Sequence, residues 1–126
     1  MFSELLGRCV LVVEDDYFQA SDLTIALEDQ GCDVVGPFST LAAGMRAFAK
    51  ARIDAAVLDI HLGAERIYGL ADQLNESNIP YLFVTGYDAT AIPERFRKIE
   101  RLSKPVELEK IIPVLTAMIS KHASRH

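Results

Sequence analysis

Five short apolar runs alternate with segments of helical periodicity along this chain, and that alternation constrains its fold more than any other feature. The runs that we predict to be strands are residues 9–13, 32–38, 54–60, 81–86 and 101–103. An unbroken apolar run such as 9–13 is typical of a strand buried on both faces. Because strands and helices take turns, the sequence predicts an α/β fold in which helices cover both faces of a parallel sheet.

Periodicity and end signals give the positions of the helices between these strands. Gly31 is expected to end the first helix, Ser39 to cap the second, and Pro93 to lie in the first turn of a short fourth. The helices that we predict cover residues 17–30, 40–51, 69–76, 89–98 and 107–121.

The first and last of these helices carry further features. Pro113 falls inside the last helix and should kink it or begin its regular part. The residues expected to form the apolar face of the first helix are Phe18, Leu23, Ile25, Ala26 and Leu27.

Length and charge restrict the classes of protein to consider. A chain of 126 residues suits one compact domain, here 1–126 with a core of about 8–121. The formal net charge of −5 argues against a general nucleic-acid binder, and the basic end at 120–126 is expected to be a short solvated tail. Cys9 and Cys32 form no CxxC pair, so reduced thiols in a cytoplasmic protein are expected. We find no secretory signal or membrane-length apolar run and expect a soluble, complete single-domain protein without a membrane partner.

Polar residues follow four of the five predicted strands at the points where those strands end. The first run leads into acidic residues, the third ends near Asp59, the fourth contains Thr85 and the fifth leads into Lys104. In an open parallel sheet, ligands bind outside the carboxyl ends of the strands. The residues expected at that edge are Glu14, Asp15, Asp16, Asp59, Thr85 and Lys104.

These residue types together favour metal-assisted phosphoryl transfer. Two carboxylates 4 Å apart repel each other by about 4 kcal/mol at an effective dielectric constant of 20, so four acids need a compensating cation. Mg²⁺ and the Lys104 ammonium would both supply positive charge, and Mg²⁺ prefers such oxygen ligands. Asp59 would then be the nucleophile that forms an aspartyl phosphate, while Thr85 and Lys104 stabilise the transferring oxygens.

The sequence resembles the receiver domain of two-component response regulators over essentially its whole length. The matching pieces are "LVVEDD", "AVLDIHL", "LFVTG" and "LSKP". The resemblance implies a flavodoxin-like (βα)5 doubly wound parallel sheet with strand order 2-1-3-4-5. The phosphoacceptor of the family falls on Asp59, its hydroxyl residue on Thr85 and its lysine on Lys104.

The resemblance also implies a ligand set and a partner. Asp15 and Asp59 should bind Mg²⁺ directly, together with the backbone carbonyl of His61, and Glu14 should act through a metal-bound water. The phosphoryl donor should be a phosphohistidine on a sensor histidine kinase or a histidine phosphotransfer protein. Asp16 has a separate explanation, because a carboxylate at the start of a helix caps free N–H groups. The side chain of His61 is expected to face solvent.

Several positions depart from the usual receiver pattern. Arg101 stands where receivers usually carry an aromatic switch residue, Val106 stands in place of a frequent Phe, and "HLGAE" replaces Met-Pro-Gly. Lys104 follows Thr85 by only 19 residues, which predicts a shortened fourth helix. The sequence is similar here to a divergent subgroup, often of stand-alone receivers, whose fourth strand reads Phe-Ala-Thr-Gly.

We expect phosphorylation to act on the region after the fourth strand. An aspartyl phosphate adds about −1.5 to −2 charges, should pull Thr85 inward and should order residues 87–103. The basic residues of that region, which otherwise form an ordinary solvated surface, are Arg95, Arg97, Lys98 and Arg101.

Other functions remain open on the same residues. A receiver without an output domain could serve as a phosphate sink, or as an interaction module independent of phosphate. An aspartyl-phosphate phosphatase commonly needs a second Asp two residues after the nucleophile, where this chain has His61. A flavin carrier of the same fold would need a phosphate-binding loop after the first strand, where carboxylates would instead repel phosphate.

Overall fold

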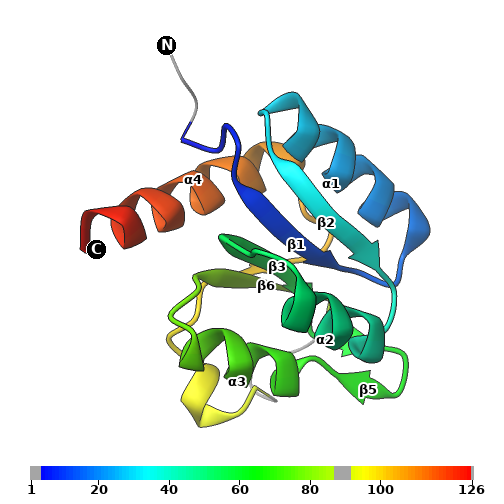
Figure 1. Cartoon of the computed structure of the whole chain (residues 1–126). Helices are drawn as coiled ribbons and strands as arrows, with labels where there is room; N and C mark the ends of the chain where they lie inside the picture. The colour runs from blue at the N-terminus through cyan, green and yellow to red at the C-terminus, as the bar shows by residue number, and fades with distance from the viewer. Residues whose placement is uncertain (1–3, 87–91, 126) are drawn as a thin grey trace.

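Five parallel strands form the central sheet, in the predicted order. The computed structural model describes residues 4–86 and 92–125, with side chains to residue 122. The strand order in the sheet is β2-β1-β3-β6-β7, which is the 2-1-3-4-5 order once the strands of this sheet are counted alone (Figure 1). The strands are β1 (Cys9–Val13), β2 (Asp33–Phe38), β3 (Ala55–Asp59), β6 (Tyr81–Thr85) and β7 (Arg101–Ser103).

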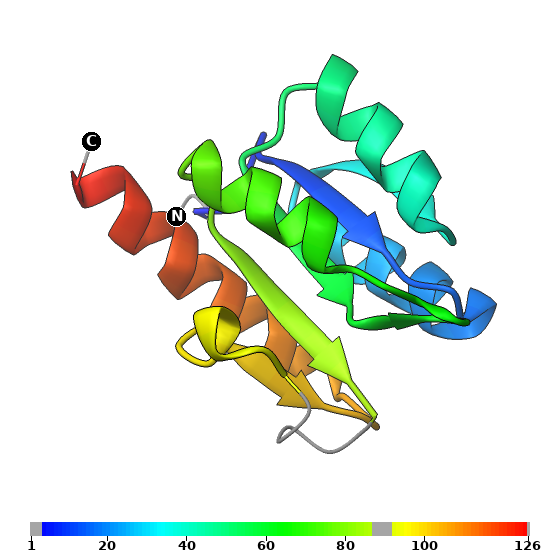
Figure 2. The ribbon, with the colours of Figure 1, turned by 90° about the horizontal axis from the view of Figure 1, so that it is seen from below.

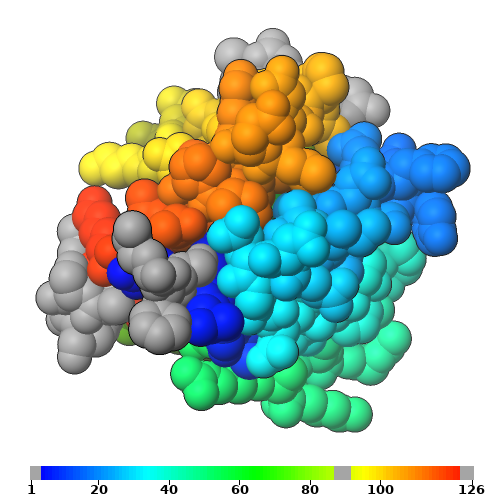
Figure 3. Space-filling model, turned by 90° about the horizontal axis from the view of Figure 1, so that it is seen from above, coloured from blue at the N-terminus to red at the C-terminus, as the bar shows by residue number. Residues whose placement is uncertain are grey.

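Helices cover both faces of the sheet, also as predicted. Helices α1 (Tyr17–Asp29) and α4 (Leu108–Arg125) cover one face, and α2 (Leu41–Lys50) and α3 (Tyr68–Glu76) cover the other (Figures 1 and 2). The space-filling view from above shows α1 and α4 side by side (Figure 3). Each face buries its own apolar layer. The doubly wound fold therefore follows from strands that are apolar on both sides.

Helix α1 buries a narrower face than the sequence predicts. Leu23 and Leu27 are buried, together with Ala20, because these positions recur three to four residues apart. Phe18 is 75% exposed and Ile25 is 56% exposed, so the expectation that both belong to the core face is wrong. They lie seven residues apart and share a second stripe of the helix, which faces outward.

Two helix ends differ from the prediction. Thr40, and not Ser39, caps α2: its backbone is extended and its Oγ1 accepts the N–H of Ala43 at 3.2 Å. A capping hydroxyl accepts an N–H from two or three residues later in the chain. Thr40 is three residues before Ala43, whereas Ser39 is four residues before it. Helix α4 continues to Arg125, so much of the expected solvated tail is helical, and Pro113 lies inside it as predicted.

In the described part of the segment between β6 and β7, residues 92–100, Glu94–Phe96 form a turn of 3-10 helix, η2. Part of the short helix expected over 89–98 lies outside the described residues. Phe96 is fully buried and stacks on Tyr68, with ring centroids 5.1 Å apart. Arg95 donates from Nε and Nη2 to the carboxylate of Asp72 at 3.0 and 3.1 Å. Both contacts attach this turn to α3.

A small hairpin after β3 was not predicted. Strands β4 (His61–Leu62) and β5 (Glu65–Arg66) pair antiparallel directly beyond the third strand of the sheet. Gly63 lies in the turn with φ +63°, a conformation that glycine adopts without steric cost. The sequence signal was present in "HLGAE", but two-residue strands are too short for an alternation pattern to show.

The structure bears on two predictions made from composition: reduced cysteines and the absence of a membrane span. Cys9 and Cys32 are both free, as predicted. Burial raises the pKa of the Cys32 thiol to about 11, so this thiol stays protonated at neutral pH. Within the described residues, no helix has the length and apolar character that a membrane span requires.

Gly31 is a position where the backbone requires glycine. Its φ is +87°, and a Cβ built there would lie 2.5 Å from Leu6 Cδ1. Gly31→Ala is therefore expected to destabilise the fold by about 1–2 kcal/mol, the cost of a left-handed conformation with a Cβ. Gly69→Ala is the matched control, since its Cβ would meet nothing and it lies in a helix, where alanine gains about 0.5–1 kcal/mol. Urea denaturation measures both; equal effects would contradict the prediction.

Candidate functional site

Three carboxylates meet at the carboxyl end of the sheet. Glu14 follows β1 and is 8% exposed, and Asp59 ends β3 and is 4% exposed. One carboxylate oxygen from each of Glu14, Asp15 and Asp59 lies within 4.8 Å of the others. Oxygen donors gathered at this spacing fit a hard divalent cation such as Mg²⁺. The structure thus brings together three of the four acidic side chains that the sequence places at this edge.

Lys104 follows the edge strand β7, and its side chain reaches the carboxylates. Its Nζ lies 3.0 Å from Glu14 Oε1 and 3.0 Å from Asp59 Oδ2. Its backbone N–H donates to the carbonyl of Thr85 at 2.8 Å, which holds the start of the β7–α4 connection against β6. One ammonium therefore links the ends of β1 and β3, with its own backbone fixed to β6.

Burial sets the protonation of this cluster. The pKa of Glu14 is raised to about 7, and burial is the largest cause. The Asp59 carboxylate also raises this pKa, whereas hydrogen bonds from the Asp16 N–H and from Lys104 lower it. For Lys104, burial would lower the pKa, but hydrogen bonds and attraction to Glu14 and Asp59 outweigh burial and raise it. The lysine stays charged, and its single charge does not keep the pKa of Glu14 at its ordinary value.

Asp16 caps α1, as the sequence predicts. Its Oδ1 accepts the N–H of Gln19 at 3.0 Å, and its backbone is extended. Its own N–H donates to Glu14 Oε2 at 3.0 Å. Asp16 therefore starts the helix and also fixes the orientation of the Glu14 carboxylate.

Thr85 lies at the end of β6 on the same edge of the sheet. Its neighbour Val84 pairs with Asp59, and Thr85 itself pairs with Ser103, the residue before Lys104. The Thr85 side chain is buried, with 3% of the residue exposed. The strand register thus places this hydroxyl-bearing residue between the elements that carry Asp59 and Lys104.

The backbone of His61 contacts Asp59. Its N–H donates to Asp59 Oδ1 at 3.2 Å, which orients the carboxylate. The residue is partly exposed and lines an open cavity beside Asp59, although its Nδ1 is buried, so the side chain faces solvent only in part. Burial lowers the pKa of His61, and the charges of Arg66 and Lys104 lower it further.

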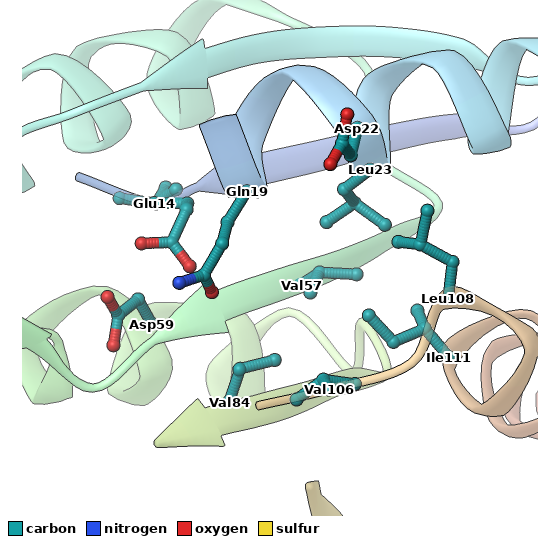
Figure 4. Close-up of a pocket in the computed structure, with 11 residues that line it drawn as sticks. Glu14, Gln19, Asp22, Leu23, Val57, Asp59, Val84, Val106, Leu108 and Ile111 are labelled. Atoms are coloured by element: carbon teal, nitrogen blue, oxygen red, sulfur yellow. The ribbon is translucent and has the colours of Figure 1, made fainter. Parts of the chain in front are cut away.

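Two cavities adjoin the carboxylates. An open one of about 490 Å³ is lined by Asp15, Asp16, Asp59, His61, Gly63, Gly86 and Lys104. A smaller one of about 80 Å³ lies between α1, α4 and the sheet. Figure 4 shows the Gln19 amide extending toward Glu14 and Asp59 at one end of the smaller cavity, with aliphatic side chains at the other. This second cavity was not predicted, and Val106, the residue after Lys104-Pro105, lies in its wall.

Arg101, the first residue of the edge strand β7, occupies the position where the resemblance predicts an aromatic residue. Arg101 lies in β7 opposite Phe83, and its Nη1 donates to the carbonyl of Arg97 at 3.2 Å. Phe83 packs against Tyr81, Tyr68 and Phe96, and the Phe96 ring centroid lies 5.7 Å from that of Phe83. An aromatic contact beside β6 is therefore present, but it comes from η2 and not from β7.

The structure is a doubly wound α/β domain with carboxylates, a threonine and a lysine at one edge of the sheet. This combination is typical of signalling domains that accept a phosphoryl group. The family model of the response regulator receiver domain matches residues 10–116. The chain therefore belongs to the response regulator receiver family of two-component signalling. No curated protein matches it significantly.

Solved structures agree with this assignment. The structure is similar to SdrG from Sphingomonas melonis Fr1, with 30% identity, a TM-score of 0.77 and coverage of 92% of this chain and 98% of SdrG. It is also similar to the signal receiver domain of a modulated diguanylate cyclase from Desulfovibrio desulfuricans G20, with 30% identity, a TM-score of 0.83 and coverage of 95% and 99%. A CheY-like receiver domain protein from Methanospirillum hungatei JF-1 shares the fold at 18% identity, with a TM-score of 0.85 and coverage of 95% and 99%.

Proposed function

We propose that this chain is a stand-alone receiver in the cytoplasm, a single domain over residues 1–126, which takes a phosphoryl group onto Asp59. The donor is a phosphohistidine on a sensor histidine kinase or a histidine phosphotransfer protein. The phosphorylated domain acts by changing its protein contacts and turns over no external substrate. The observation that carries the proposal is the buried Asp59, held 3.0 Å from Lys104 Nζ and grouped with two further carboxylates.

Each site residue has a distinct task in this proposal. Asp15, Asp59 and the backbone carbonyl of His61 would hold Mg²⁺, and Glu14 would act through a metal-bound water. Bound Mg²⁺ supplies positive charge to the oxygens of the transferring group. Asp59 attacks phosphorus with a carboxylate oxygen, the bond to the donor breaks, and the leaving group departs with its electron pair. Lys104 and Thr85 stabilise charge on the oxygens of the new aspartyl phosphate.

We also place the chain in the subgroup with a Phe-Ala-Thr-Gly-type fourth strand. The support is the run Phe83 to Gly86, Arg101 at the usual aromatic position, and a 3-10 turn where a full helix is usual. In this proposal phosphorylation of Asp59 pulls Thr85 inward and orders residues 87–103. The part of the proposed ordered region at 87–91 lies outside the described residues.

A phosphate sink is the second candidate, because it uses the same chemistry and needs no output partner. A phosphate-independent interaction module is disfavoured by the intact set of Asp59, Thr85 and Lys104 at one edge. A phosphatase is disfavoured by His61 at the position of the second acid.

The test is direct phosphorylation of the purified chain. Incubation with acetyl phosphate and Mg²⁺ is expected to add one phosphoryl group, detected by intact-mass spectrometry and mapped to Asp59 by borohydride trapping. Omitting Mg²⁺ or adding EDTA should remove the adduct, because four acids without the metal repel the donor. No adduct from acetyl phosphate or from a phosphorylated kinase would overturn the proposal, and turnover of a small phosphoester would favour the phosphatase.

A further inference from the structure

The β4–β5 hairpin forms one side of the entrance to the open cavity. His61 and Gly63 come from the hairpin, and Asp15 and Asp16 line the same cavity from the β1–α1 connection. The hairpin follows β3 directly and projects from the sheet edge beside α2 (Figure 1). The acidic connection and the hairpin therefore both border the cavity that contains Asp59.

The hairpin carries an arginine next to this entrance. Arg66 pairs across the hairpin with His61, so the two side chains lie on the same face of it. Arg66 is exposed, and its Nη1 donates to the carbonyl of Glu65 at 3.2 Å. None of the ion pairs among the described residues involves its guanidinium. Its positive charge is therefore not neutralised by a carboxylate partner there, and it lies directly across the hairpin from His61, which lines the cavity.

We propose that Arg66 is a specificity-determining residue for the phosphoryl donor, because it presents a guanidinium to the anionic phosphate of the donor at the entrance to the site. The inference rests on the proposed function. The chemistry that it recognises is a phosphoryl group carrying two negative charges, which a phosphohistidine and a small acyl phosphate share, and acetyl phosphate is the probe.

Charge explains why such a residue is needed here. The chain has a net charge of −5, and the entrance is lined by Asp15 and Asp16. A dianionic donor is repelled by these acids before it reaches Lys104 inside. A cation on the opposite side of the entrance raises the encounter rate of an anion, and salt screens this effect because the Debye length is about 10 Å at 0.1 M. The same cation repels Mg²⁺, so its removal affects donor and metal in opposite directions.

The test compares phosphorylation rates of Arg66→Gln and the unaltered chain with acetyl phosphate at saturating Mg²⁺. Arg66→Gln is expected to react about three- to tenfold more slowly at low ionic strength, the lower end of electrostatic steering effects. The difference should disappear near 1 M salt, where the Debye length is about 3 Å. Arg66→Lys should keep most of the rate, since it keeps the charge. Mg²⁺ affinity, measured by calorimetry, should be unchanged or tighter in Arg66→Gln.

Arg52→Gln is the matched control. Arg52 is also exposed but pairs with Asp54 before β3, at the opposite edge of the sheet, and its loss should leave the rate unchanged. Equal rates for Arg66→Gln and the unaltered chain at every salt concentration would overturn the inference alone. A rate loss that persists at 1 M salt, or one accompanied by weaker Mg²⁺ binding, would overturn it as well, because either indicates structural damage. No adduct in the unaltered chain would overturn the proposed function and the inference together.

Discussion

Asp59→Asn is expected to take up no phosphoryl group from acetyl phosphate or from a phosphorylated kinase. The amide keeps the size of the side chain but removes the nucleophilic carboxylate oxygen. It also removes one proposed Mg²⁺ ligand, so Mg²⁺ should bind more weakly. Because Asp59 is one of the groups that raise the pKa of Glu14, that pKa should fall in the variant. Intact-mass spectrometry measures the adduct, and calorimetry measures Mg²⁺ binding.

Asp54→Asn is the control for this variant. Asp54 precedes the same strand but lies at its other end, where its Oδ2 accepts the N–H of Cys9 at 2.8 Å. This control should keep the full adduct, even if it loses some stability with that hydrogen bond. An adduct that survives in Asp59→Asn and maps to Asp15 or Glu14 would show that the phosphoacceptor has been assigned to the wrong carboxylate.

The acidic and basic residues of the site could be predicted because each one follows a strand. Strand ends are readable from apolar runs, and a parallel sheet gathers its carboxyl ends at one edge. Glu14, Asp59 and Lys104 are brought together by this rule alone, although 45 residues separate the last two. The capping carboxylate of Asp16 was predictable too, since the signal and the contact are three residues apart.

The features that could not be predicted depend on tertiary packing. The hairpin that carries His61 consists of two-residue strands, which carry no periodic signal. The outward stripe of Phe18 and Ile25 reads like a core face until the position of α1 against α4 is known. Phe96 takes up the contact with Phe83 because η2 attaches to α3, and no local pattern announces that contact.

The metal-free protein is expected to lose stability as the pH rises from 5 to 8, and Glu14 is the cause. Burial raises its pKa from 4.5 to about 7, so the folded state binds a proton that the unfolded state releases earlier. The stability that Glu14 contributes is complete below pH 4.5 and is lost as the pH rises through 7. This pKa shift of Glu14 corresponds to about 3 kcal/mol in the free energy of unfolding. Mg²⁺ should reverse the trend, since metal binding favours the ionised carboxylate and strengthens with pH.

Glu14→Gln separates this contribution from that of the other carboxylates. In EDTA, the free energy of unfolding of Glu14→Gln from urea titrations should vary less between pH 5 and 8, and at pH 8 the variant should be the more stable protein. Asp16→Asn is the matched control, because asparagine caps a helix as well as aspartate and leaves the N–H to Glu14 in place. Its pH profile should follow that of the unaltered chain. Parallel profiles for Glu14→Gln and the unaltered chain would mean that Glu14 is ionised throughout, held so by Lys104 at 3.0 Å. The site would then be ready for Mg²⁺ at every pH in this range.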